Sequence, residues 1–167
     1  SLQQNTNQLV TIVQPNIKQK NKWILKNREK HLNNLINLSV KSQDIFNNKN
    51  RIIIWPETSF EGSIPDETKL LSNITKKILK YKNTILILGL LRTNENMVFN
   101  SLVFLNSKGN IIHNYDKIKL VPFGEYIPFR QYLSPLTDML PQKDFTSGKL
   151  KSNPTIYGFE NIITLIC

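Results

Sequence analysis

An α/β fold with a mixed sheet is the fold class that the sequence predicts. Apolar runs rich in Ile, Leu and Val, short enough to be strands, alternate with two segments that have the apolar periodicity of helices. Three strand-like runs then follow without a helix between them, and a proline-rich loop separates them from a last apolar run. The predicted order is therefore β-α-β-α-β-β-β-loop-β, which is typical of helices packed on a sheet with parallel and antiparallel strands.

The first strand is predicted at residues 9–14 (LVTIVQ), and a proline ends it. A long helix is predicted from Ile24 to Phe46. Its apolar face carries Leu25, Leu32, Leu35, Ile36 and Leu38. Residues 51–55 (RIIIW) predict a second strand that also ends at a proline. Glu57 is therefore expected just past the carboxyl end of a buried strand.

Asp66 is predicted to cap the second helix. The apolar residues of that helix recur at helical spacing, at Leu70, Leu71, Ile74, Ile78 and Leu79. Residues 84–91 (TILILGLL) predict a strand that is apolar on both faces, and residues 97–106 predict another. The turn residues 107–110 (SKGN) lead into a strand at 111–115, so they predict a hairpin.

A loop-rich segment from 121 to 154 leads to the last predicted strand, residues 162–167 (IITLIC), which ends at Cys167. Strands that are apolar on both faces and covered by helices on one of them need a second layer behind. The length of 167 residues favours a single domain with its own core. We assign residues 1–8 to a polar leader and residues 9–167 to this domain.

Composition excludes several classes of protein. One cysteine excludes a disulfide framework and any metal site with several cysteine ligands. The two histidines, His31 and His113, have no partners at ligand spacing, so no metal is predicted. The longest apolar run, 84–91, is far shorter than the roughly 20 residues that span a bilayer.

The formal charge of +10 allows three interpretations. The lysines are spread singly along the chain, which favours a solvated basic surface. Attraction to an anionic membrane surface is the second interpretation. Nucleic-acid binding is the least favoured, because no aromatic-interleaved stretch, zinc-finger spacing or RNA-binding signature accompanies the lysines. We therefore predict no nucleic-acid partner.

Three residues with reactive side chains follow strand ends or end a strand, where open sheets place their sites: Glu57, Lys117 and Cys167. Trp55 and Pro56 are expected to hold Glu57 rigid and partly desolvated. Burial of that kind raises the pKa of a carboxyl group towards the range of a general base. The alternative for Glu57 is a charge at the start of a following helix.

Lys117 follows a predicted strand, where an ammonium can stabilise the negative charge of a tetrahedral intermediate; otherwise it is a surface lysine. Cys167 is either an inert core residue or a nucleophile, which needs a base and a positive neighbour. Glu57 and Lys117 would supply both. Glu125 lies in residues 120–128 (LVPFGEYIP), where two prolines and a glycine stiffen the loop. It would anchor the Lys117 ammonium or orient a substrate amine, or else belong to an ordinary surface loop.

Together, WPET around Glu57, residues 115–128 (YDKIKLVPFGEYIP) and LIC at Cys167 resemble the nitrilase superfamily, and more narrowly its apolipoprotein N-acyltransferase branch. The family's catalytic glutamate, lysine and cysteine fall on Glu57, Lys117 and Cys167. The LVPFGEY loop points to this branch, and its required glutamate falls on Glu125. The resemblance implies an α-β-β-α sandwich with mixed sheets.

The resemblance covers about residues 9 to 167. The opening LVTIVQPNIKQKNKW is similar to the branch's first strand and places a functionally important tryptophan on Trp23. Residues 100–102 (NSL) resemble the family's Tyr-Asn-Ser strand, with Phe99 in place of the tyrosine.

What the resemblance implies is a two-step acyl transfer without a metal or organic cofactor. Glu57 takes the thiol proton, and Cys167 attacks the sn-1 ester of a membrane phospholipid while Lys117 helps to hold the oxyanion. The resulting thioester then acylates the α-amine of a diacylglyceryl-cysteine apolipoprotein, in ping-pong covalent catalysis. The parent enzyme would lie in the bacterial inner membrane, with this domain facing the periplasm.

Two departures from the family lead us to expect a fragment that is inactive alone. Family members have transmembrane helices around this domain, and we expect residues 1–8 of this chain to be the former linker to such helices. Family members also continue beyond the cysteine. Two other functions stay open. One is a soluble nitrilase-type amidohydrolase that uses the same three residues with water as acceptor. The other is a non-catalytic remnant that binds a lipid or a partner.

Overall fold

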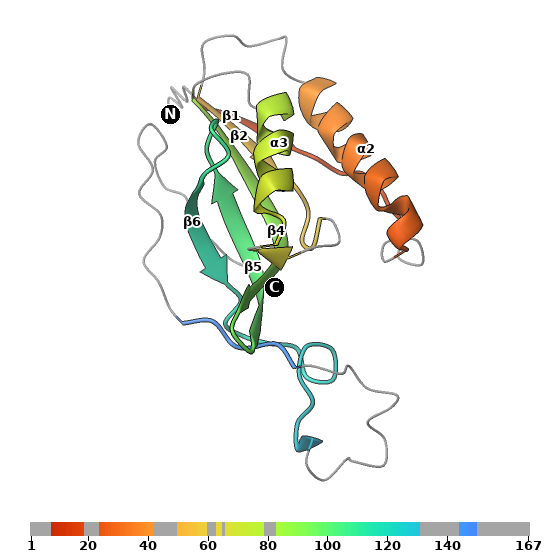
Figure 1. The fold of residues 1–167 in the computed structure, drawn as a ribbon, viewed down its shortest axis with the longest axis vertical. Helices are drawn as coiled ribbons and strands as arrows, with labels where there is room; N and C mark the ends of the chain where they lie inside the picture. The colour runs from red at the N-terminus through yellow and green to blue at the C-terminus, as the bar shows by residue number, and fades with distance from the viewer. Residues whose placement is uncertain are drawn as a thin grey trace, which may run out of the picture.

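A computed structural model describes residues 8–18, 24–41, 50–59, 63–64, 66–78, 83–130 and 144–149. These residues form one mixed sheet with helices on one of its faces (Figure 1). The predicted α/β class with a mixed sheet is confirmed. The predicted strand at 162–167 and the helix residues beyond Lys41 lie outside the described part of the chain.

The described sheet has the strand order β1-β2-β4-β5-β6, with β3 paired to β4. Its strands are β1 (Gln8–Ile12), β2 (Asn50–Ile54), β3 (Ser63–Ile64), β4 (Thr84–Asn94), β5 (Met97–Leu105) and β6 (Ile111–Asp116). Strands β1, β2 and β4 are parallel, and β4, β5 and β6 are antiparallel. The parallel strands therefore end at one edge of the sheet, where Glu57 follows β2.

The predicted hairpin between β5 and β6 is confirmed, and Gly109 supplies the positive φ of 82° that its turn needs. The short strand β3 was not predicted, because two residues are too few to show a periodicity. Strand β4 is longer than predicted. Its last residues pair with the start of β5, and Asn94 lies opposite Met97 across a two-residue turn.

Two helices, α2 (Arg28–Lys41) and α3 (Thr68–Ile78), cover the same face of the sheet (Figure 1). The predicted start of the first helix at Ile24 is wrong by four residues, because the chain there forms a tight 3-10 turn, η1 (Leu25–Asn27). The Leu71 amide donates to the Glu67 carbonyl at 2.9 Å, so Glu67 rather than Asp66 lies at the start of the second helix. Asp66 instead accepts a hydrogen bond from Ser63.

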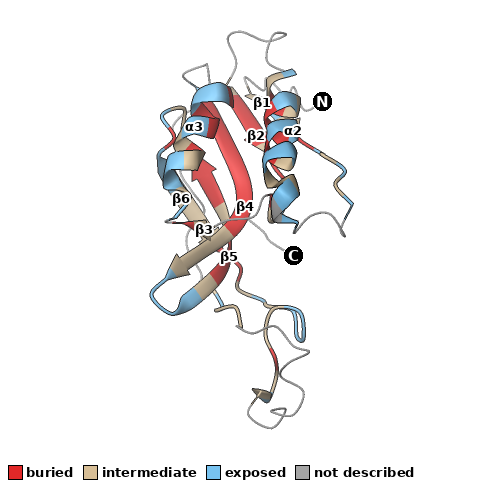
Figure 2. Cartoon of the chain, turned by 45° about the vertical axis from the view of Figure 1, so that its right-hand side comes forward, coloured by how far each residue is buried: buried red, intermediate tan, exposed pale blue. Residues whose placement is uncertain are grey.

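The main core lies between the helices and the sheet, where the strands are buried (Figure 2). Its largest buried side chain is Trp55, which follows β2 and is 1% exposed. The indole nitrogen of Trp55 donates to the Ser39 hydroxyl of α2 at 2.8 Å, and that hydroxyl donates to the Leu35 carbonyl. A buried indole with a satisfied N–H fixes the end of β2 against α2, and so it fixes the chain two residues before Glu57.

The opposite face of the sheet is also apolar. Ile52, Ile85, Ile87 and Phe104 form a second buried cluster there. On the same face of β1, Val10 and Ile12 are 51% and 77% exposed. Successive residues of a strand point to opposite faces, so strands that are apolar throughout give a sheet that is apolar on both faces. The second layer over this face, and with it the α-β-β-α sandwich, stays a prediction.

Candidate active site

Glu57 lies in a turn that continues the contact of β2 with β4. The Trp55 amide donates to the Ile87 carbonyl, and the Ser59 amide donates to the Gly89 carbonyl, both at 2.8 Å. Between these bonds the chain turns through Thr58, which has a positive φ of 47°. The turn is therefore pinned to β4 on both sides of Glu57.

Gly89 is what allows the turn to approach so closely. A Cβ atom on Gly89 would lie 2.7 Å from the Glu57 Cα and 2.8 Å from the Thr58 nitrogen. Real Cβ atoms essentially never come this close to backbone atoms, so only a glycine fits without a shift of the chain. The close packing against β4 sets the position of the Glu57 backbone.

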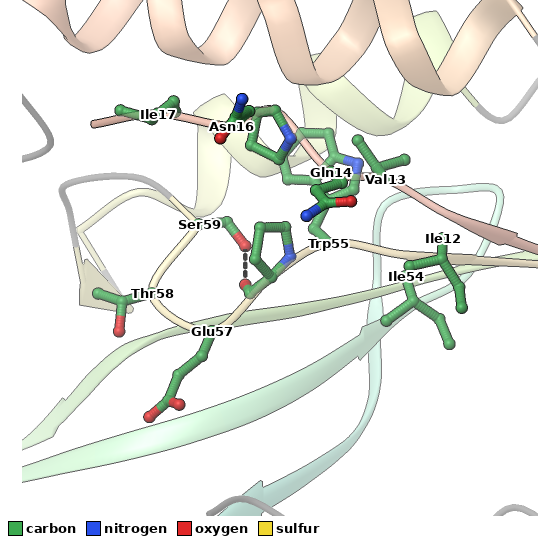
Figure 3. A pocket seen from close by; sticks show the side chains of 12 residues that line it. Ile12, Val13, Gln14, Asn16, Ile17, Ile54, Trp55, Glu57, Thr58 and Ser59 are labelled. Carbon is green, nitrogen blue, oxygen red and sulfur yellow. Dashed lines mark hydrogen bonds between the residues drawn. The ribbon is translucent and has the colours of Figure 1, made fainter. Parts of the chain in front are cut away.

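The Glu57 side chain is exposed, so the predicted partial desolvation is wrong for the described structure. Trp55 is buried against α2, but the chain leaves the core at Pro56 and carries Glu57 out beyond the strand. Figure 3 shows the carboxylate pointing away from Gln14 and Asn16, which line a cavity of about 350 Å³ beside the end of β2. The alternative that Glu57 starts a helix does not hold either, since α3 begins at Thr68.

Lys117 follows β6 and is 3% exposed. Its backbone amide donates to the Asn100 carbonyl of β5 at 2.8 Å, which extends the hairpin by one residue. Its ammonium nitrogen lies 3.1 Å from Oε1 and 3.0 Å from Oε2 of Glu125. The surface-lysine alternative for Lys117 is therefore excluded.

The loop that carries Glu125 is folded back on itself. The Glu125 amide donates to the Val121 carbonyl at 2.9 Å, while the Glu125 Oε2 accepts from the Val121 amide at 2.8 Å. The Phe123 amide donates to the Tyr126 carbonyl, and Phe123 has a positive φ of 61°. These bonds aim the Glu125 carboxylate inward at Lys117.

Asn100 joins the two carboxylates. Its Nδ2 donates to Glu57 Oε1 at 2.6 Å and to Glu125 Oε1 at 3.0 Å. The structure thus brings Glu57, Glu125 and Lys117 into one hydrogen-bonded cluster with Asn100 at its centre. The sequence showed Asn100 only as part of a strand resemblance, although an amide inside an otherwise apolar strand is a signal that could have marked it.

A second polar cluster supports the chain just before Lys117. Asp116 accepts two hydrogen bonds from Arg92, at 3.0 and 2.8 Å, and one from Ser101 at 2.7 Å. The Arg92 guanidinium also lies 4.4 Å from the centre of the Phe99 ring. By strand alternation these side chains lie on the face of β5 opposite to that of Asn100. They hold the backbone at Asp116, so the position of Lys117 is fixed from both faces.

The pKa of Glu125 lies below its ordinary value. Burial is the largest single influence and favours the protonated acid, but the hydrogen bonds from the Val121 amide, Asn100 and Lys117, and the charge of Lys117, together outweigh it. Glu125 is therefore ionised at neutral pH and forms an ion pair with the Lys117 ammonium.

This lowered pKa predicts a pH dependence of stability. A carboxyl group with a lower pKa in the folded protein binds fewer protons there than in the unfolded chain, so it stabilises the fold above the ordinary glutamate pKa of 4.5. That stabilisation is lost as the pH falls from this value through the folded pKa. We expect Glu125→Gln to flatten the acid part of a curve of unfolding free energy against pH. A curve with unchanged slope between about pH 5 and 3 would contradict the ion pair.

Cys167 and Trp23 lie outside the described residues, so their predicted places in the site stay predictions. No helix within the described ranges has the length and apolarity that crossing a membrane requires.

The family model of carbon-nitrogen hydrolases matches residues 9–167. The chain therefore belongs to the carbon-nitrogen hydrolase family, and the mixed α/β fold agrees with that family. This confirms the predicted membership of the nitrilase superfamily.

Relatives identify the branch that the chain resembles. The apolipoprotein N-acyltransferase of Brucella suis biovar 1 (strain 1330) is 28% identical over 95% of this chain and 31% of its own length. The enzyme of the same name from Wigglesworthia glossinidia brevipalpis is 32% identical over 95% of this chain and 32% of its own length. The chain thus spans about a third of the length of these relatives. A crystal structure of an N-terminal amidase is also similar, with a TM-score of 0.48 and 19% identity over 67% of this chain and 28% of that one.

Proposed function

We propose that this chain carries the glutamate, the lysine and the cysteine of an apolipoprotein N-acyltransferase. The observation that supports it best is the cluster of Glu57, Asn100, Glu125 and Lys117, in which two carboxylates and one buried ammonium are joined by four side-chain hydrogen bonds and ion-pair contacts. Acyl transfer by a cysteine needs a base for the thiol and a positive charge for the oxyanion. The cluster offers both kinds of group.

In the first step Glu57 accepts the proton of the Cys167 thiol, and the sulfur attacks the carbonyl carbon of a phospholipid ester. The Lys117 ammonium stabilises the negative charge on the carbonyl oxygen of the tetrahedral intermediate. The ester C–O bond then breaks, and the leaving alkoxide takes the proton back from Glu57. A thioester on Cys167 and a lysophospholipid result.

In the second step the α-amine of a diacylglyceryl-cysteine attacks the thioester carbonyl. Glu57 accepts a proton from the ammonium group of the second intermediate, the C–S bond breaks to leave an amide on the acceptor, and Glu57 returns the proton to the Cys167 thiolate. Glu125 keeps the Lys117 ammonium in place during both steps, because it contacts that nitrogen with both oxygens. We further propose that the site faces the periplasm at the bacterial inner membrane, where a basic surface also suits anionic lipid head groups.

The proposal predicts that Glu57→Gln lowers the rate of thioester formation by about 10²- to 10⁴-fold, which is the usual contribution of a positioned general base. The full chain that the gene encodes is mixed with phospholipid vesicles, and mass spectrometry follows the gain of an acyl group on Cys167, with hydroxylamine to release a thioester. Glu29→Gln, an exposed residue of α2, is the matched control.

Acylation of Cys167 that ignores Glu57→Gln would count against Glu57 as the base. Absence of any thioester with phospholipid, together with hydrolysis of small amides, would replace the acyltransferase with an amidohydrolase that uses the same three residues.

A further inference from the structure

Residues 144–148 bind the backbone of both members of the Lys117–Glu125 ion pair (blue in Figure 1). The Gly148 amide donates to the Lys117 carbonyl at 2.8 Å. The Phe145 amide donates to the Glu125 carbonyl at 2.7 Å. We call residues 144–148 the strap, because this one short segment holds two site residues that come from different parts of the fold.

The strap is also anchored at points outside the ion pair. The Thr146 amide donates to the Val98 carbonyl of β5 at 2.6 Å. At the start of the strap, Asp144 accepts one hydrogen bond from Arg130 Nε at 3.1 Å and a second from Arg130 Nη2. The strap therefore joins the sheet to the end of the loop that carries Glu125.

Gly148 is the point at which the strap comes closest to the chain at Lys117. A Cβ atom on Gly148 would lie 2.2 Å from the carbonyl oxygen of Asp116 and 2.7 Å from its carbonyl carbon. Both are backbone atoms of the residue before Lys117, so no side-chain rotation could make room for a methyl group. The φ of Gly148 lies outside the left-handed region. The glycine is therefore required by this close contact and not by a turn.

The strap completes the backbone hydrogen bonds of the ion pair. The Lys117 amide donates to the Asn100 carbonyl, and the Glu125 amide donates to the Val121 carbonyl, while the strap binds the carbonyls of both residues. Hydrogen bonds at both the N–H and the C=O of a residue restrict its φ and ψ, and so they restrict the direction of its side chain. The ion pair keeps the two charged ends together, whereas the strap determines where the pair lies relative to β5.

We propose that the strap sets the position of the Lys117 ammonium in the site, and that Gly148 is a positioning residue for the reaction. This inference rests on the proposed role of Lys117, which is to stabilise the negative charge on the carbonyl oxygen. A methyl group at Gly148 would push the strap away from the end of β6 and lengthen the bond to the Lys117 carbonyl. A displacement of about 1 Å at a group of this kind costs about a hundredfold in rate.

The test is a double-mutant cycle of Gly148→Ala and Lys117→Met in the full chain that the gene encodes. Phospholipid vesicles supply the acyl group, and mass spectrometry follows the acylation of Cys167 in a single turnover. Each rate is divided by the folded fraction from a urea denaturation curve. We expect Gly148→Ala to lower the rate by about a hundredfold when Lys117 is present. In Lys117→Met it should lower the rate by no more than about twofold, because the ammonium that the strap positions is already absent.

A strap that only supports folding would lower the rate by the same factor with and without Lys117, and that result would overturn the inference. Lys149→Ala is the matched control, since Lys149 is exposed and directly follows Gly148, and it is expected to keep the wild-type rate. If Gly148→Ala does not fold, Ser147→Ala decides, because it removes the hydrogen bond from the Ser147 hydroxyl to the Ile118 carbonyl and adds no atom. Its expected loss is about threefold to tenfold, again only when Lys117 is present.

The same cycle separates this inference from the proposed function. An unchanged rate in Lys117→Met would remove the proposed role of the ammonium, and the inference would fall with it. A large loss in Lys117→Met without any loss in folded Gly148→Ala would remove only the role of the strap.

Discussion

Lys117→Met is expected to lower acyl transfer by at least about a hundredfold and to reduce the free energy of unfolding by about 1–3 kcal/mol. The first effect follows from the proposed role of the ammonium, which is to stabilise the negative charge on the reacting carbonyl oxygen. The second follows because Glu125, which is half-buried with 12% side-chain exposure, would keep its negative charge without its ion-pair partner. Turnover with a lipid donor and urea denaturation measure the two effects separately.

The double variant Lys117→Met, Glu125→Gln distinguishes catalysis from stability. Removal of both charges leaves no unpaired ion, so most of the lost stability should return, as it does when a buried ion pair is replaced as a unit. The activity should stay low, because no ammonium is restored. Lys119→Met is the control, since Lys119 is exposed two residues away. Recovery of activity in the double variant would show that Lys117 acts only through folding.

The sequence predicts most of the fold because local patterns determine it. The apolar periods of α2 and α3 are regular, and prolines end β1 and β2 within about two residues of the observed ends. The start of α2 was missed because residues 24–27 have helical composition but form a 3-10 turn, a choice between two similar local structures. The choice between an α-helical turn and a 3-10 turn depends on tertiary packing, and it does not change the apolar periodicity of the sequence.

The site was predicted less completely than the fold. The sequence marked Glu57, Lys117 and Glu125 as candidates because each follows a strand or lies in a stiff loop, and the structure brings the three together. The exposure of Glu57 was not predicted, because neighbours in sequence do not show where the chain leaves the core. Trp55 is buried and hydrogen-bonded to Ser39 of α2, whereas Glu57 lies two residues past that contact and is exposed. Asn100 was missed as a site residue because its partners are 43 and 25 residues away. Long-range hydrogen bonds of this kind have no local pattern.

The position of the Glu57 turn should depend on the absence of a Cβ atom at Gly89. Gly89→Ala would place a Cβ 2.7 Å from the Glu57 Cα and 2.8 Å from the Thr58 nitrogen, and both are backbone atoms that cannot rotate away. The turn must shift outward, and the bond from the Ser59 amide to the Gly89 carbonyl must lengthen. A displacement of about 1 Å at a catalytic group costs about a hundredfold in rate, and overpacking costs about 1–3 kcal/mol in stability.

Gly124→Ala is the matched control, because a Cβ there would meet its nearest atoms, all from Val121, at 3.6 to 3.9 Å. We expect this variant to keep its activity within about twofold and its stability within about 0.5 kcal/mol. Both variants add the same methyl group near the site, so the difference between them isolates close packing of the turn from any general effect of losing a glycine. Equal activity and stability of Gly89→Ala and Gly124→Ala would show that Glu57 is positioned by something other than its contact with β4.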